Sequence, residues 1–369
     1  MKKLILGLLP FVFLFPACHQ ENTTTKIPVK DTVLVSWQDS HIHEMGRIND
    51  QGPDHAVLYW PGTSLKIRFQ GQKVEVLLKD QRGKNYFDVV LDDAEPVLFR
   101  PDSKKHWYVL ADSLPPGEHL LEFFKRTEWT HGSTDFYGFR ITGEAAVLPP
   151  PETTGRVIEF FGNSITAGYA DRDTVGDAPD STLTDNYVTY GAITARHYNA
   201  DYYCTARGGI GILISWFPMI MPDMYDRLDP EDPASKWDFS KVQPDVVVIN
   251  LFQNDSWLVK MPDYPEFRHR FGDTPPTARQ IIDAYKDFTG KIRAVYPKAR
   301  IICALGPMDA TREGSPWPGY IRKAVEEMHD PAMYTLFFPY LEKDGHPKVK
   351  DHRVMADTLI RFIDKNIKW

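Results

Sequence analysis

Residues 157–166 read Val-Ile-Glu-Phe-Phe-Gly-Asn-Ser-Ile-Thr, and this stretch decides which fold the second half of the chain can adopt. It opens with a mostly apolar run that has the length of a buried strand. Gly162-Asn163-Ser164 then reads as a turn into a helix, in which a small residue leaves the serine hydroxyl accessible. Ligands of open α/β sheets bind beyond the carboxyl ends of the strands. Ser164 therefore lies where chemistry is expected, although a serine there is also a common helix N-cap.

The rest of the second half alternates between two kinds of pattern. Strand-like runs occupy 201–206, 245–251, 299–305 and 334–338, and helix-like runs occupy 186–197, 278–295, 319–328 and 350–366. This alternation predicts an α/β domain over 155–369, with a mostly parallel sheet covered by helices on both faces. Residues that follow different strands of such a sheet can meet at one edge.

The first half follows a different period. Apolar residues alternate with polar ones, as in Leu65, Ile67 and Phe69, and turn residues such as Pro61-Gly62 separate the runs. Short alternating strands at near-regular spacing predict an antiparallel β-sandwich over 31–150, with no convincing helix. The Pro149-Pro150-Pro151 break separates it from the α/β domain.

The first eighteen residues have the pattern of a targeting signal. Lys2 and Lys3 precede a twelve-residue apolar run, which is too short to span a bilayer as a helix. The Ala17-Cys18 pair resembles the lipobox of bacterial lipoproteins, and this resemblance implies cleavage and lipidation at Cys18. Residues 19–30 would then be a polar tether that holds the protein on a bacterial cell envelope, at its periplasmic or surface face. The alternative is a plain secreted protein.

Composition narrows the classes of function. The 43 Lys and Arg against 50 Asp and Glu give a net charge of −7, which argues against a general nucleic-acid binder. Three cysteines cannot form a disulfide framework. We expect no cofactor and no metal, because the His41-x-His43-Glu44 cluster lacks further paired ligands by spacing. A further acidic stretch does not match an EF-hand and is interpreted as a solvated loop: Asp171, Asp173, Asp177, Asp180 and Asp185.

Three more fragments follow strands or precede the last helix. Gly209, in Arg207-Gly208-Gly209-Ile210-Gly211, permits close backbone approach to a ligand, although a simple tight turn explains it too. Asn254 can donate an amide hydrogen to an oxyanion or form an Asx turn. His346 supplies a base, and Asp344 lies close enough in sequence to orient it. Together these fragments supply what acyl transfer requires.

No serine is centred in a Gly-x-Ser-x-Gly elbow, which disfavours the usual α/β-hydrolase arrangement. The order of a Gly-x-Ser, a glycine, Asn-Asp and a C-terminal His-Pro instead resembles the SGNH (GDSL-type) hydrolases. In the first half, Met45-Gly46-Arg47, Tyr59-Trp60-Pro61-Gly62 and Phe124-Lys125-Arg126-Thr127-Glu128 resemble the N-terminal jelly-roll-like domain of carbohydrate esterase family two. Those enzymes are bacterial deacetylases of plant polysaccharides.

The resemblance implies a role for each matching residue. Ser164 is the expected nucleophile, His346 the base and Asp344 the carboxylate that orients it. The Gly209 N–H and the Asn254 amide join the Ser164 N–H as the expected oxyanion hole. One more candidate is argued from its place just past Asn254 and not from the resemblance: Trp257, as an aromatic platform for sugar rings.

Two departures from the family pattern have expected consequences. Asn163 replaces the usual aspartate and keeps a hydrogen-bonding side chain without the charge. Phe252-Gln253 replaces Gly-Thr, and we expect Phe252 to reshape the pocket beside the nucleophile.

The function expected from all this is removal of O-acetyl groups from a polysaccharide or oligosaccharide, with no nucleic acid as partner. Two alternatives remain open from the sequence. One is a surface glycan-binding lipoprotein whose esterase site has decayed. The other is an SGNH lipase or thioesterase.

Overall fold

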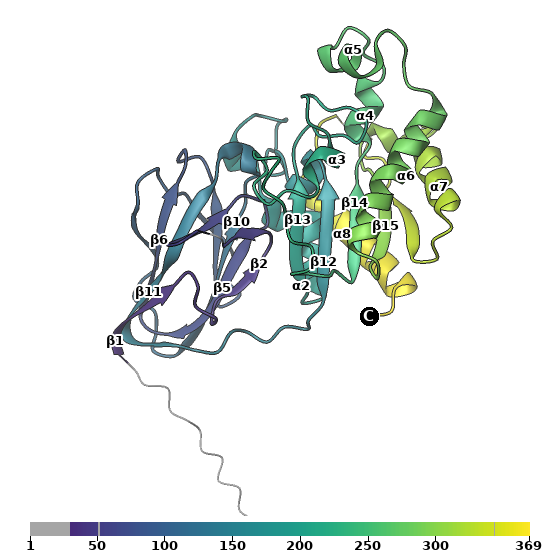
Figure 1. Cartoon of the computed structure of the whole chain (residues 1–369). Coiled ribbons are helices and arrows are strands. Elements are labelled where there is room, and N and C mark those ends of the chain that lie inside the picture. Colours follow the sequence, from purple (N-terminus) through teal and green to yellow (C-terminus); the bar gives the residue numbers. More distant parts are fainter. Residues whose placement is uncertain (1–29, 51, 343) are drawn as a thin grey trace, which may run out of the picture.

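A computed structural model describes residues 30–50, 52–342 and 344–369 (Figure 1). The predicted signal segment, the lipidation candidate Cys18 and nearly all of the polar tether lie outside the described residues. Within the described ranges, no helix combines the length and apolar character needed to cross a membrane.

The N-terminal domain is built from antiparallel strands, as the period-two pattern predicts. Its strands are β1 (Lys30–Ser36), β2 (His43–Met45), β3 (Ile48–Asn49), β4 (Ala56–Leu58), β5 (Ser64–Gln70), β6 (Lys73–Asp80), β7 (Phe87–Leu91), β8 (Val97–Phe99), β9 (His106–Ala111), β10 (Glu118–Lys125) and β11 (Thr134–Val147). The long β11 pairs with β1, β4 and β6, and its last residues pair with β5, so it joins the two layers. The only helical element among the described residues of this domain is the 3-10 turn η1 (Trp129–His131).

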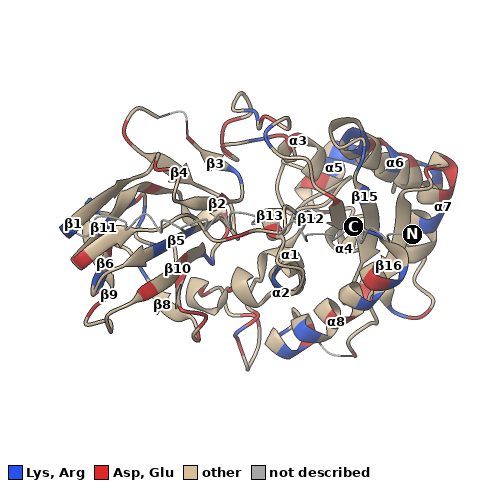
Figure 2. Ribbon diagram, turned by 90° about the horizontal axis from the view of Figure 1, so that it is seen from below, with Lys and Arg blue, Asp and Glu red and all other residues tan. Residues whose placement is uncertain are grey.

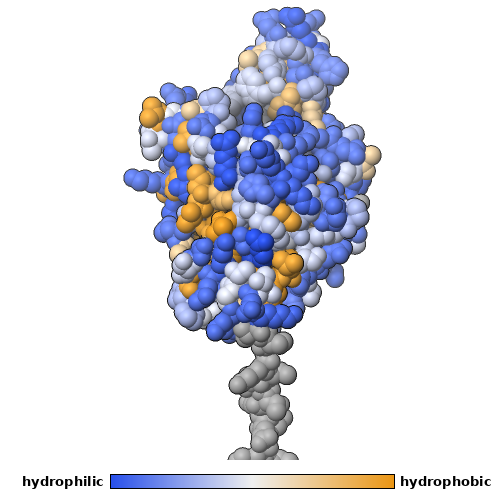
Figure 3. Space-filling view, turned by 90° about the vertical axis from the view of Figure 1, so that its left-hand side faces the viewer, coloured by the Kyte–Doolittle hydropathy of each residue, from blue (hydrophilic) through white to orange (hydrophobic). Residues whose placement is uncertain are grey.

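The core of this β-domain explains the alternation in its sequence. Leu65, Ile67 and Phe69 on β5 are each fully buried, while the residues between them are partly exposed. One face of each strand therefore packs into the sandwich and the other faces outward. A few apolar side chains on β1, β8 and β9 stay exposed, and Figure 3 shows small hydrophobic patches among hydrophilic side chains at this end of the molecule.

The C-terminal domain contains a five-stranded parallel sheet. Its strands are β12 (Val157–Gly162), β13 (Asp201–Ala206), β14 (Val246–Asn250), β15 (Arg300–Leu305) and β16 (Met333–Phe337). They lie in the order β13-β12-β14-β15-β16, and every neighbouring pair is parallel. The sheet confirms the α/β fold predicted from the strand–helix alternation.

Helices cover both faces of this sheet. The elements are α1 (Ser164–Ala167), η2 (Ser181–Leu183), η3 (Asn186–Val188), α2 (Tyr190–His197), α3 (Met221–Met224), α4 (Gln253–Leu258), α5 (Pro265–Phe271), α6 (Ala278–Val295), η4 (Asp309–Thr311), α7 (Trp317–Met328) and α8 (Val349–Asn366). Helices α2 and α8 share one buried cluster with the sheet, and α6 and α7 share the other. The outer surfaces of α6, α7 and α8 carry basic and acidic residues interspersed (Figure 2).

The two domains are joined by a buried contact. Arg47 of the β-domain is 2% exposed and donates to the Glu159 carboxylate on β12 at 2.7 Å. Its guanidinium also donates to the carbonyls of Tyr225 and Arg227. Because an unpaired buried charge is strongly destabilising, this pairing fixes the docking of the β-domain on the sheet.

Candidate active site

The nucleophile candidate lies at the carboxyl edge of the parallel sheet. Ser164 is the first residue of α1, directly after β12, and is 8% exposed. Asn163 is the N-cap, and its side-chain oxygen accepts the Ile165 N–H at 3.0 Å. The first N–H groups of a helix have no acceptor within the helix. The Ser164 N–H accordingly has no acceptor among the described residues and is available to a ligand.

The base candidate reaches the same point from the last loop of the chain. The His346 Nε2 lies 2.8 Å from the Ser164 Oγ, although the two residues are 182 positions apart. Pro347 is buried, and α8 begins two residues later. The ring of Tyr169 packs edge-on against the imidazole with a centroid separation of 5.0 Å. The structure therefore brings together the hydroxyl and the imidazole that the sequence placed at separate strand ends.

The carboxylate at His346 is not the one expected from the sequence. The Asp177 Oδ2 lies 2.6 Å from the His346 Nδ1, and the Asp177 carboxylate also accepts the His346 backbone N–H. Asp344 is exposed, and the ring nitrogen it was expected to hold is taken by Asp177. The assignment of Asp344 as the orienting residue is therefore wrong in this geometry. Between Asp344 and His346 the chain turns at Gly345, which has a φ of 85°.

Asp177 belongs to the segment 168–189 after α1, here called the Asp177 loop. The Lys348 Nζ donates to the Asp177 Oδ1 at 2.9 Å and to the carbonyl of Ala170 at 2.8 Å. Hydrogen bonds from His346 lower the pKa of Asp177 well below its ordinary value, and the Lys348 ammonium acts in the same direction. The carboxylate therefore stays ionised and can stabilise a protonated imidazole.

Reasoning from sequence assigned Asp177 to a solvated acidic stretch. Of that stretch, Asp173 accepts the backbone N–H groups of Val175, Gly176 and Ala178, so it folds the loop rather than facing solvent. The signal that could have found Asp177 is the density of aspartates after the Ser164 helix, at the edge of the sheet where His346 was already expected. No spacing rule links residue 177 to residue 346.

The expected oxyanion donors also meet near Ser164. The segment 207–216, here called the Gly209 loop, follows β13 and passes beside the serine. Gly209 has a φ of 80°, and its carbonyl accepts the Trp216 N–H at 3.1 Å. Its own N–H has no acceptor among the described residues. A Cβ at position 209 would lie 3.1 Å from the Phe217 ring and 3.2 Å from the Trp216 ring, so both backbone angle and space favour glycine.

Asn254 and Asp255 tie this loop to α4. The Asn254 Nδ2 donates to the Ile210 carbonyl at 2.8 Å, which leaves its second amide hydrogen for a ligand. The fully buried Asp255 carboxylate accepts the N–H groups of Ile212, Leu213 and Ile214. Burial raises the pKa of Asp255 to about 6, against the effect of these hydrogen bonds.

The aromatic platform is predicted at Trp257, but a second tryptophan lies nearer to the expected oxyanion donors. Trp257 is half-buried, and its indole N–H donates to the Asp309 carboxylate at 2.9 Å. Trp216 is 39% exposed, contacts Gly209, and donates its indole N–H to the Asn254 Oδ1 at 3.0 Å. Trp216 is thus an exposed residue bonded to both expected oxyanion donors, to Asn254 through its indole and to Gly209 through its backbone N–H, and sequence reasoning did not single it out.

The expectation for Phe252 is wrong. Its side chain is fully buried and packs on the rings of Tyr285 and Trp317, away from solvent. Its φ of 85° turns the chain into α4. Phe252 therefore shapes the core beneath the site and does not line a substrate pocket.

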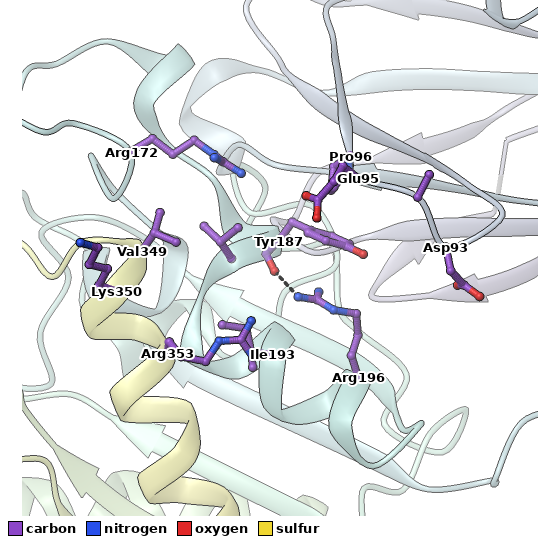
Figure 4. Close-up of a pocket in the computed structure, with 12 residues that line it drawn as sticks. Asp93, Glu95, Pro96, Arg172, Tyr187, Ile193, Arg196, Val349, Lys350 and Arg353 are labelled. Carbon is purple, nitrogen blue, oxygen red and sulfur yellow. Dashed lines mark hydrogen bonds between the residues drawn. The ribbon is translucent and has the colours of Figure 1, made fainter.

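Other features bear on ligand binding. In the described part of the chain, no group of three or more histidine, cysteine, aspartate or glutamate side chains could hold a metal ion. His43, from the sequence cluster near the N-terminus, donates its Nε2–H to the Asp201 carboxylate across the domain boundary at 2.8 Å. A cavity of about 550 Å³ lies between the loop at Asp93–Pro96 and helices α2 and α8 (Figure 4). Neither Ser164 nor His346 lines it, so it is separate from the candidate active site.

Comparisons with known proteins agree with this geometry. Residues 44–151 match the family described as carbohydrate esterase 2 N-terminal, and residues 160–334 match the GDSL-like lipase/acylhydrolase family. The chain is 31% identical over 336 residues to cellulase/esterase CelE of Acetivibrio thermocellus, and it spans only 39% of the length of that protein. It is 24% identical over 365 residues to an acetylxylan esterase / glucomannan deacetylase of Cellvibrio japonicus, covering 97% of this chain and 96% of the other.

A solved structure gives the family assignment its strongest support. A family two carbohydrate esterase from Clostridium thermocellum, in complex with cellohexaose, superposes with a TM-score of 0.77 and 30% identity, over 88% of this chain and 98% of that one. The match thus covers both domains in the same order. The chain belongs to the family two carbohydrate esterases, which makes it a carboxylic ester hydrolase.

Proposed function

We propose that this protein is a serine esterase that removes O-acetyl groups from a polysaccharide or oligosaccharide. One observation carries the proposal. An unbroken line of hydrogen bonds joins the Ser164 Oγ, the His346 ring and the Asp177 carboxylate, at separations of 2.8 Å and 2.6 Å. This is the arrangement of an activated nucleophile, its base and the group that orients the base.

The reaction proceeds in two steps. His346 takes the Ser164 proton as the serine oxygen attacks the acetyl carbonyl, and Asp177 stabilises the imidazolium. The oxyanion is held by the N–H groups of Ser164 and Gly209 and by the free amide hydrogen of Asn254. The C–O bond to the sugar breaks, and His346 protonates the leaving alcohol. Water then attacks the acetyl-serine, with His346 again as base, and releases acetate.

The carbohydrate assignment is supported by the relatives and by Trp216. Two relatives are described as acetylxylan esterases and glucomannan deacetylases. An exposed indole next to the oxyanion donors provides a flat apolar face on which a sugar ring can stack. We expect Trp216→Ala to raise KM for acetylated oligosaccharides and to leave KM for p-nitrophenyl acetate, which has no sugar, nearly unchanged.

The deciding experiment measures acetate release from a panel of acetylated glycans, with wild type beside Ser164→Ala. We expect the wild type to deacetylate at least one glycan and Ser164→Ala to lose this activity while its thermal unfolding is unchanged. Full activity in Ser164→Ala would end the serine mechanism. Glycan binding by the wild type without acetate release would instead favour a non-catalytic glycan-binding protein.

Chain length of the acyl group separates the esterase from a lipase or thioesterase. The wild type should hydrolyse p-nitrophenyl acetate faster than p-nitrophenyl octanoate. The reverse preference would indicate a long apolar acyl site and overturn the acetyl assignment.

We also propose that the mature protein is anchored to a bacterial envelope membrane through lipidated Cys18. Metabolic labelling with a radioactive fatty acid should mark the wild type and not Cys18→Ser. Absence of label in both would leave a secreted protein.

A further inference from the structure

A carboxylate from the β-domain lies inside the catalytic edge of the other domain. Glu128 follows β10, directly before η1, and is half-buried. Its Oε2 accepts the Gly208 N–H at 2.6 Å, across 80 residues of sequence. Its Oε1 accepts the Thr130 hydroxyl at 2.7 Å, which holds the carboxylate from its own side of the interface.

The bond falls beside the nucleophile. A Cβ built on Gly208 would lie 3.5 Å and 3.6 Å from the two Glu128 oxygens and 3.8 Å from the Ser164 Cβ. Glu128 and Ser164 therefore flank the same glycine. A Cβ at position 208 would be in ordinary van der Waals contact with both residues, so the start of the Gly209 loop packs directly between them.

The peptide that carries the Gly209 N–H lies next to the group that Glu128 binds. The Glu128 bond to the Gly208 N–H restrains the backbone on one side of the Gly208–Gly209 peptide. The Trp216 N–H restrains the other side through the Gly209 carbonyl. The Gly209 N–H between these two restraints has no protein acceptor among the described residues. A donor aimed in advance at a developing charge lowers the barrier because nothing reorganises during the reaction.

A second residue of the β-domain, Trp129, also contacts the Gly209 loop. The Arg207 guanidinium lies 4.8 Å from the centroid of the Trp129 ring and 3.2 Å from that of Phe217. Residues 128 and 129 thus form a short segment of the β-domain that touches the start of the Gly209 loop at both its backbone and its side chain.

We propose that Glu128 is a positioning residue, through which the β-domain sets the direction of the Gly209 N–H in the oxyanion hole. This inference rests on the proposed esterase function. It gives the β-domain a part in the chemistry that is distinct from holding substrate. The active site is incomplete without it, although every reacting side chain comes from the α/β domain.

The competing explanation is that Glu128 merely helps to dock the two domains. Docking has other strong contacts, among them the buried Arg47–Glu159 pair. The His43–Asp201 bond at 2.8 Å also crosses the interface, and it lies at the opposite end of β13 from the Gly209 loop. Asp201→Ala, which removes the acceptor of the His43 ring, is therefore a matched control that disturbs docking without touching the candidate active site.

The test compares Glu128→Ala, Glu128→Gln and Asp201→Ala by steady-state kinetics on p-nitrophenyl acetate and by thermal unfolding. We expect Glu128→Ala to lower kcat by about 10²-fold with KM nearly unchanged, as for the loss of one oxyanion donor. Glu128→Gln should recover at least tenfold over Glu128→Ala, because its amide oxygen can still accept the Gly208 N–H. Asp201→Ala should keep the wild-type kcat.

A second readout needs no turnover. The Gly208 amide proton, observed by NMR in a glycine-labelled sample, should lie downfield in the wild type and move upfield in Glu128→Ala. If kcat is unchanged in Glu128→Ala, or if Asp201→Ala loses as much kcat as Glu128→Ala, the positioning role is overturned and the esterase proposal stands. If instead Ser164→Ala is as active as the wild type, the esterase proposal itself fails, whatever the Gly208 shift shows.

Discussion

Two loops complete the catalytic edge, and they are built in opposite ways. The Gly209 loop is held from beneath by the fully buried Asp255, which accepts three of its N–H groups, and it carries the buried side chains of Ile210, Ile212 and Ile214. The Asp177 loop is polar, and it is folded by its own Asp173 and by Lys348. The Gly209 loop is part of the core, whereas the Asp177 loop is exposed at its tip, residues 174–180, and is buried only toward its two ends.

The difference between the two loops reflects what each one must hold in place. The Gly209 loop presents backbone N–H groups, which need a rigid peptide, and burial supplies the rigidity. The Asp177 loop presents one charged side chain, which must stay ionised and therefore lies where solvent and Lys348 can reach it. The ionised carboxylate of Asp177 is thus kept near the surface, and the backbone geometry of the Gly209 loop is fixed by the core.

The largest expected effect compares the two aspartates near His346. Asp177→Asn should lower kcat by about 10³–10⁴-fold, because the imidazolium loses its stabilising charge and the ring can adopt the wrong tautomer. Asp344→Asn should stay within about twofold of the wild type, as is usual for an exposed surface position. Kinetics on p-nitrophenyl acetate measures both. A loss in Asp344→Asn that matches the loss in Asp177→Asn would restore the assignment made from the sequence.

The next effect concerns the donor attached to the Gly209 loop. Asn254→Ala should lower kcat by about 10²–10³-fold, because one oxyanion donor is removed. It also removes the bonds to Ile210 and Trp216, so unfolding must be measured in parallel. Turnover at the wild-type level in a normally folded variant would exclude Asn254 from the reaction.

The third effect tests whether the loops differ in stability. Asp255→Ala leaves buried N–H groups without acceptors and should lower the free energy of unfolding by about 2–4 kcal/mol in urea titrations. Asp173→Ala should lower activity more than stability, because it loosens only the Asp177 loop. Equal losses of stability in the two variants would contradict the contrast between a core loop and a surface loop.

The smallest effect depends on pH. The pKa of Asp177 is lowered in the folded state from its ordinary value of 3.8, so its stabilising contribution is fully present above that pH and is lost as the pH falls below it. The difference in melting temperature between wild type and Asp177→Asn should therefore be constant above about pH 5 and shrink toward pH 3. A difference that grows on acidification would have the wrong sign for this carboxylate.

Much of the fold was predictable because it rests on local patterns. The helix expected over 278–295 and the strand expected over 201–206 coincide with α6 and β13. The helix expected over 186–197 is instead divided at Thr189 into η3 and α2, because Thr189 is an extended N-cap. The short helices α4 and α5 were not predicted, since a helix of one or two turns has too few residues to show periodicity.

Sequence patterns alone predicted the two folds and the Ser164–His346 pair that the structure brings together, and they predicted Gly209 and Asn254 as oxyanion donors, because each residue follows a strand or precedes a helix. The packing of loops and domains was needed to show which carboxylate holds His346, which tryptophan is exposed beside Asn254, and that Glu128 reaches Gly208 from the other domain. Those contacts join residues 80–169 positions apart or depend on which way a ring turns. Hydrogen bonds of that kind are set by how loops and domains pack, and packing leaves no spacing rule in the chain.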